Sequence, residues 1–137
     1  TGEGRWRGGP GIHWEAINEG SDGQMATGSS DGDVVQGFGA QGGNPSPVCR
    51  TYIDRGDERI RVKPHRLVKI KQNDIIIKQS SGGGGVGNPA ERDPEMVLED
   101  VINELVSIEA ARDIYKVAID PESQTIKEGE THKLRAS

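Results

Sequence analysis

The sequence predicts an α+β fold in which β strands and glycine-rich, polyproline-II-like segments precede a short C-terminal helix pair. Short runs of alternating apolar and charged residues occupy the middle of the chain and are typical of half-buried strands. Several of the 20 glycines of this 137-residue chain stand in runs, which favour extended backbone without internal hydrogen bonds. After residue 93, apolar residues recur with the spacing of an amphipathic helix.

The strands can be placed from this alternation and from the turn residues between the runs. We expect them at residues 12–17, 48–53 and 58–62, and on both sides of a turn at 72–74 within the run 67–77. Residues 21–32 mix Ser, Asp and Gly and are expected to form a loop.

Two glycine-rich runs, residues 37–45 and 82–87, are expected to pack together as polyproline-II-like segments, because glycine permits close approach of two backbones. Flexible loops are the alternative. The second run matches G-x-G-x-x-G, but Asn88 and Pro89 stand where a phosphate-binding helix would have to begin. The Gly-Lys-Ser/Thr of a Walker loop is absent as well. We therefore expect no nucleotide to be bound by this chain alone.

The C-terminal part has the clearest helix signals. Asp93 can cap a helix with Pro94 at its first position, and Ser107 can cap a second one. The apolar stripe of the first helix is expected to extend to Leu105. A short strand, a turn and a return strand at 125–126 should follow, and then a polar tail. The expected organisation is a glycine-rich region, 1–89, and a helical hairpin with its tail, 90–137, forming one unit that a partner completes.

Composition and charge limit the possible functions. Only 31% of the residues are hydrophobic and 4% aromatic, so the core is expected to be thin and a partner to bury part of the surface. Residues 50–78 hold nine Lys and Arg against four Asp and Glu, whereas the whole chain carries a net charge of −5. Nucleic acid is not an expected partner, because this basic region contains one aromatic residue, Tyr52, and the chain is acidic overall.

Other sequence signals are weak or missing. The single Cys49 excludes an intramolecular disulfide and supports no cysteine-based metal site. The sequence has no apolar run long enough for a membrane span and no signal-peptide pattern, so a cytoplasmic location is expected. If residues 5–7 are extended, Arg5 and Arg7 share one face and Trp6 takes the other. The two guanidinium groups would then form an anion clamp or a pair of structural salt bridges. No catalytic residue can be assigned.

Several motifs together resemble the hydantoinase B/oxoprolinase family, whose members include subunits of 5-oxoprolinases, N-methylhydantoinases and ketone carboxylases. They are Gly4–Gly11, Gly42–Pro45, Lys63–Pro64, Gly82–Pro89, Glu91–Glu95, Asp100–Val101, Leu105–Arg112 and Tyr115–Val117. Family members are much longer, so the chain resembles their C-terminal portion, either as a fragment or as a separately encoded small subunit.

The resemblance implies a role within a larger enzyme. The expected function is that of a small subunit of an ATP-dependent ketone carboxylase complex, of the acetophenone carboxylase type, that uses bicarbonate. A 5-oxoprolinase or N-methylhydantoinase subunit is the first alternative, and a non-catalytic scaffold the second. The implied partners are larger hydantoinase A-type and B-type subunits, and ATP and Mg²⁺ are expected on them. The residues expected to have structural or interface roles are Arg5, Trp6, Arg7, Gly42, Gly43, Gly82, Gly83, Gly84, Gly85, Gly87, Pro89, Arg92 and Asp93.

Overall fold

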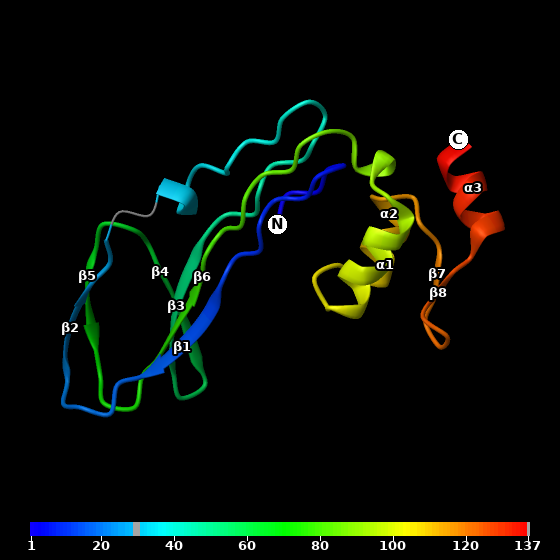
Figure 1. The fold of residues 1–137 in the computed structure, drawn as a ribbon. Coiled ribbons are helices and arrows are strands. Elements are labelled where there is room, and N and C mark those ends of the chain that lie inside the picture. Colours follow the sequence, from blue (N-terminus) through cyan, green and yellow to red (C-terminus); the bar gives the residue numbers. More distant parts are fainter. Residues whose placement is uncertain (29–30, 137) are drawn as a thin grey trace. The chain divides into compact units, whose positions relative to one another are not determined.

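The structure, a computed structural model, describes residues 1–28 and 31–136 and confirms the α+β class (Figure 1). Contacts divide the chain into two compact units. Unit 1 comprises Thr1–Pro10, Phe38–Ser46 and Gly83–Ser137, and unit 2 comprises Gly11–Gly37 and Pro47–Gly82. This division differs from a boundary at residue 89, because the glycine-rich segments contact one another and the helices, although they are far apart in the sequence.

Unit 2 is built on a four-stranded antiparallel sheet with the strand order β1-β6-β3-β4 (Figure 1). The strands are β1 (His13–Ile17), β3 (Arg50–Arg55), β4 (Glu58–Val62) and β6 (Ile75–Gln79). All four overlap strands expected from the alternation, although β3 and β6 each end two residues later than expected. The core of the unit includes the buried side chains of Ile53, Val62 and Ile77.

A separate two-stranded ribbon in unit 2 pairs β2 (Gly23–Ala26) with β5 (Leu67–Ile70). The prediction of a loop over residues 21–32 is therefore wrong at β2, while residues 29 and 30 lie outside the described part of the chain. Sequence alternation could not reveal β2, because its four residues include one glycine and few apolar side chains. Its strand conformation comes from pairing with residues more than 40 positions away.

The expected turn at 72–74 is held by a buried carboxylate. Asp74 is 1% exposed and accepts hydrogen bonds from Arg55 Nε and Nη2, at 2.9 and 2.7 Å, and from the Lys71 amide at 2.8 Å. The Arg55 hydrogen bonds are the main cause that lowers the pKa of Asp74 below its usual range. Asn73 takes a φ of +67° in this turn, a conformation that asparagine tolerates better than most residues.

Unit 1 contains a bundle of three segments with little regular secondary structure, which we call the glycine bundle: residues 1–10, 38–46 and 83–88. Backbone hydrogen bonds join the three segments, and residues 83–88 both donate and accept them. Trp6 and Val86 exchange two, Gly2 N donates to Gly83 O, and Ala40 N donates to Gly85 O, all at 2.8 to 2.9 Å. The two glycine runs thus pack together as expected.

The helices of unit 1 begin where the capping residues predict. The short η2 (Pro89–Glu91) precedes α1 (Pro94–Ile102), and Ser107 caps α2 (Ile108–Asp113). The Asp93 side chain accepts from the Glu95 amide at 2.9 Å. Because α1 ends at Ile102, Leu105 is not on its apolar stripe and remains 41% exposed, which corrects the expectation. The core contains Val97, Ala111, Tyr115, Val117 and Ile119.

The C-terminal segment is a helix rather than the expected polar tail. After the hairpin of β7 (Ile119–Asp120) and β8 (Thr125–Ile126), α3 spans Glu128–Ala136. The segment has few apolar residues, so its helix was not visible in the pattern. Acidic residues in its first turn and basic residues in its last turn stabilise the helix by interacting favourably with its dipole. Thr131 Oγ1 anchors it by accepting from the Ala118 amide at 3.1 Å. None of the helices in the described residues is long and apolar enough to span a membrane.

Candidate functional site

Residues predicted to be structural come together in unit 1 around the carboxylate of Asp100. Arg7 Nε donates to Asp100 Oδ1 at 2.8 Å, and Arg92 Nη2 lies 2.9 Å from Oδ2. Arg92 and Asp100 are each 4% exposed. Arg92 Nη1 also donates to the Arg5 carbonyl at 3.1 Å. One buried carboxylate therefore links the glycine bundle, η2 and α1.

The proposed anion clamp of Arg5 and Arg7 does not form. The Arg7 guanidinium is neutralised by Asp100, whereas the Arg5 guanidinium carbon lies 6.0 Å from the centroid of the Trp6 ring, at the outer limit of a cation–π contact. Trp6 itself is 57% exposed. The salt-bridge alternative is thus the one that the structure supports for Arg7.

Several of the predicted glycines lie where a side chain would not fit or would be strained. A Cβ added at Gly43 would meet the carbonyl of Gly85, and one at Gly84 would meet the carbonyl of Phe38. Gly42 and Gly87 take positive φ values of +91° and +77°. The remaining predicted residues have other roles. Gly83 and Gly85 each donate and accept backbone hydrogen bonds, with residues 1–10 and 38–46 respectively, Pro89 begins η2, Asp93 caps α1, and Gly82 belongs to unit 2.

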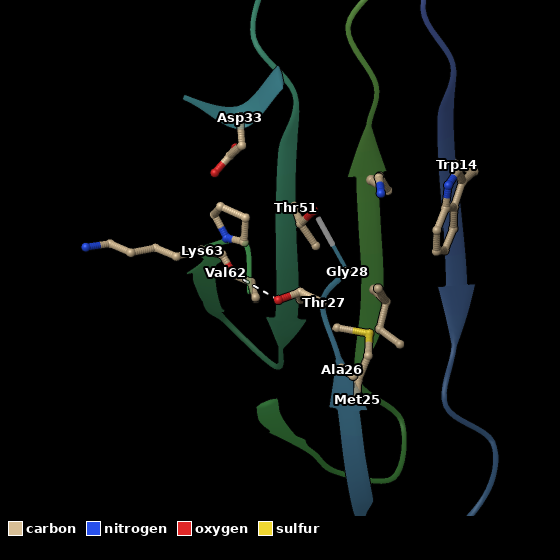
Figure 2. Close-up of a pocket in the computed structure, with 12 residues that line it drawn as sticks. Trp14, Met25, Ala26, Thr27, Gly28, Asp33, Thr51, Val62 and Lys63 are labelled. Carbon is tan, nitrogen blue, oxygen red and sulfur yellow. Dashed lines mark hydrogen bonds between the residues drawn. The ribbon is translucent and has the colours of Figure 1, made fainter. Parts of the chain in front are cut away.

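A cavity of about 210 Å³ lies within unit 2 and is the candidate binding site (Figure 2). One wall is a row of residues in register across the whole sheet: Trp14 pairs with Lys78, Lys78 with Thr51, and Thr51 with Val62. Directly paired residues of an antiparallel sheet point to the same face. The lining also includes Met25 of β2 and the residues that follow it.

The acidic residue in the cavity wall, Asp33, is already paired with two arginines, but the side chain of the central lysine, Lys78, has no partner among the described residues. Asp33 Oδ1 lies 2.7 Å from Arg61 Nη2 and 3.5 Å from Arg50 Nη1. Among the described residues, the ammonium of Lys78 has no hydrogen-bond or ion-pair partner, and the hydroxyl of Thr51 has none either. Lys63 contributes little charge to the cavity, because its side chain extends away from the other labelled residues in Figure 2.

The sequence shows which residue types are present, but it does not show that they come together in one cavity. Trp14, Thr51 and Lys78 stand on three strands, and the positions 14 and 78 are 64 residues apart. Asp100, the centre of the unit 1 cluster, was also missed as a site residue, although it stands in one of the motifs that carry the family resemblance. In residues 1–28 and 31–136, no group of three or more His, Cys, Asp or Glu side chains could hold a metal ion.

Comparison with known proteins agrees with the resemblance. The caprolactamase subunit beta of Pseudomonas jessenii is 33% identical over 142 residues, covering 99% of this chain and 24% of that protein. The acetophenone carboxylase delta subunit of Aromatoleum aromaticum is 38% identical over 58 residues, covering 42% of this chain and 8% of that protein. The crystal structure of ATP-dependent caprolactamase from P. jessenii superimposes with a TM-score of 0.75 at 27% identity, over 98% of this chain and 24% of the matched chain.

The chain thus spans about a quarter of the length of the caprolactamase subunit that it matches from end to end. The sequence model described as hydantoinase B/oxoprolinase matches residues 1–89, which is more than half of the chain. The chain belongs to the hydantoinase B/oxoprolinase family.

Proposed function

We propose that this chain forms part of a hydantoinase B-type subunit in an ATP-dependent complex that opens cyclic amides. The observation that carries this proposal is the match to caprolactamase subunit beta over 99% of the chain, together with the TM-score of 0.75 to ATP-dependent caprolactamase. We favour ring opening over the ketone carboxylation expected from the family resemblance, since the match to the carboxylase subunit covers 42% of the chain.

The proposed role of the chain is to support a site that larger hydantoinase A-type and B-type partners complete. ATP and Mg²⁺ would be held by those partners, where phosphorylation activates the carbonyl group of the substrate. Large apolar side chains remain exposed in this chain, among them Val34 at 76% and Phe38 at 86%. Exposed apolar residues of this size favour burial against other protein surface.

The test uses the native complex purified with this chain in place. It is supplied with ATP and Mg²⁺ and assayed for hydrolysis of caprolactam, 5-oxoproline and hydantoin, with ADP release measured in parallel. Ring opening that requires ATP supports the proposal. ATP-dependent fixation of ¹⁴C-bicarbonate onto acetone or acetophenone, without ring opening, would contradict it.

Ketone carboxylation is the second candidate, because the identity to the acetophenone carboxylase delta subunit reaches 38% within the matched 58 residues.

The alternative that this chain is a non-catalytic scaffold predicts a different outcome. A complex that loses this chain would then keep its ATP-dependent turnover once its subunits are held together, for instance by chemical cross-linking before the chain is removed by proteolysis.

A further inference from the structure

We propose that the cavity of unit 2 binds a small organic carboxylate with an apolar body, and that Lys78 provides the positive charge that recognises it. The cavity is the hollow lined by Trp14, Met25, Thr51, Val62 and Lys78, among others (Figure 2). Its ligand class follows from the size of the cavity, from its apolar surface and from the polar groups that remain unpaired.

The size selects a small molecule. A volume of about 210 Å³ corresponds to roughly seven water molecules at about 30 Å³ each. Sites for drug-sized ligands have volumes of about 300 to 1,000 Å³, so this cavity suits a smaller molecule. The buried Val62 and the side chains of Met25 and Ile76 give the cavity an apolar surface, which suits a hydrocarbon chain or a single ring.

The unpaired polar groups select a ligand with hydrogen-bond acceptors. Lys78 lies between Trp14 on β1 and Thr51 on β3 in one cross-strand row, and neighbouring strands are about 4.8 Å apart. Each of these three side chains can donate a hydrogen bond, and none has a hydrogen-bond partner among the described residues. The two oxygens of a carboxylate can accept from the ammonium and from a neighbouring donor at the same time.

The charge around the cavity also favours an anion. Asp33 is the one acidic residue among the lining residues that the structure describes, and Arg61 and Arg50 already neutralise it. Lys78 is half-buried on a central strand, where an unpaired ammonium is less well solvated than in open water. A bound carboxylate would compensate this charge. The inference does not depend on the reaction that the complex catalyses, because it rests on the cavity residues of unit 2 alone.

The experiment measures binding to the native complex in the absence of ATP, by the broadening of the ¹⁹F NMR signal of 4-fluorobenzoate. The neutral 4-fluorobenzamide has nearly the same shape and is the matched probe. We expect saturable binding of 4-fluorobenzoate, with an affinity at least about tenfold higher than that of the amide, since a hydrogen bond to a charged group is stronger than one to a neutral group.

Variants assign the binding to this cavity. Lys78→Met should weaken 4-fluorobenzoate binding about tenfold or more, whereas Lys78→Arg, which keeps the charge, should retain most of it. Lys71→Met is the control, because Lys71 is an exposed lysine outside the cavity wall, and it should not change the affinity. Equal binding of the two probes, no saturable binding, or a Lys78→Met protein with normal affinity would each overturn the proposal.

Discussion

The close packing of the glycine bundle can be tested with two adjacent glycines. A Cβ added at Gly8 would lie 2.9 Å from Gly83 Cα and closer still to the Gly83 carbonyl, whereas one added at Gly9 would meet nothing within 4 Å. Carbon atoms normally pack at about 3.5 to 4.0 Å, so alanine at position 8 must push residue 83 away. Gly9→Ala is therefore a control one residue along the chain.

The expected difference follows from these contacts. Overpacking costs typically about 1 to 3 kcal/mol, and replacing glycine with alanine at a compatible position stabilises by about 0.4 to 1 kcal/mol through the unfolded chain. Gly8→Ala should therefore lower the local opening free energy of the bundle by about 2 kcal/mol, while Gly9→Ala should leave it unchanged or raise it slightly. A loss of about 2 kcal/mol corresponds to roughly 30-fold faster amide exchange.

Hydrogen exchange followed by mass spectrometry reads this difference in the assembled protein. The reporter amides are those of Gly2 and Gly83, which donate to Gly83 O and Gly9 O at 2.8 and 2.9 Å. We expect faster exchange of both in Gly8→Ala and not in Gly9→Ala. Equal protection in the two variants, or unprotected amides in the parent protein, would show that the segments do not pack as the structure describes.

Three further predictions concern unit 1. Asp100→Ala should lower the free energy of unfolding by about 3 to 5 kcal/mol, because Arg92 is left buried without a counter-charge. Urea unfolding measures this, and Arg7→Met and Arg92→Met combined with Asp100→Leu should recover most of the loss, because all three charges are then removed together. Tyr115→Phe should leave the unfolding free energy unchanged or raise it by up to about 1 kcal/mol, since the buried hydroxyl has no partner among the described residues; a large loss would contradict this. Asp120 accepts backbone hydrogen bonds from Ser123 and a side-chain bond from Lys127, which help to lower its pKa from 3.8 to about 2. Its stabilising contribution is complete above pH 3.8 and lost as the pH falls through about 2; a carboxyl titration by ¹³C NMR with a midpoint near 4 would refute this.

Local signals in the sequence predicted the elements whose cause is local. The caps Asp93 and Ser107 each act on an amide two or three residues away, and both helices begin beside them. The alternation at 58–62 marks the more buried face of β4, whereas all five residues of β1 are exposed although the sequence alternates there in the same way. α3 and β2 were missed because neither carries an apolar period. Thr131 holds α3 through the Ala118 amide, and β2 depends on its pairing with β5.

The sequence by itself determined the fold class, because caps and alternating strands act through neighbouring residues, and its motifs carried the resemblance to the family. Only the tertiary structure decided which residues meet. It put Arg7 and Arg92 on the same carboxylate and set Lys78 between Trp14 and Thr51. Both arrangements join positions tens of residues apart, and strand pairing and ion pairing over such distances leave no periodic mark in the chain.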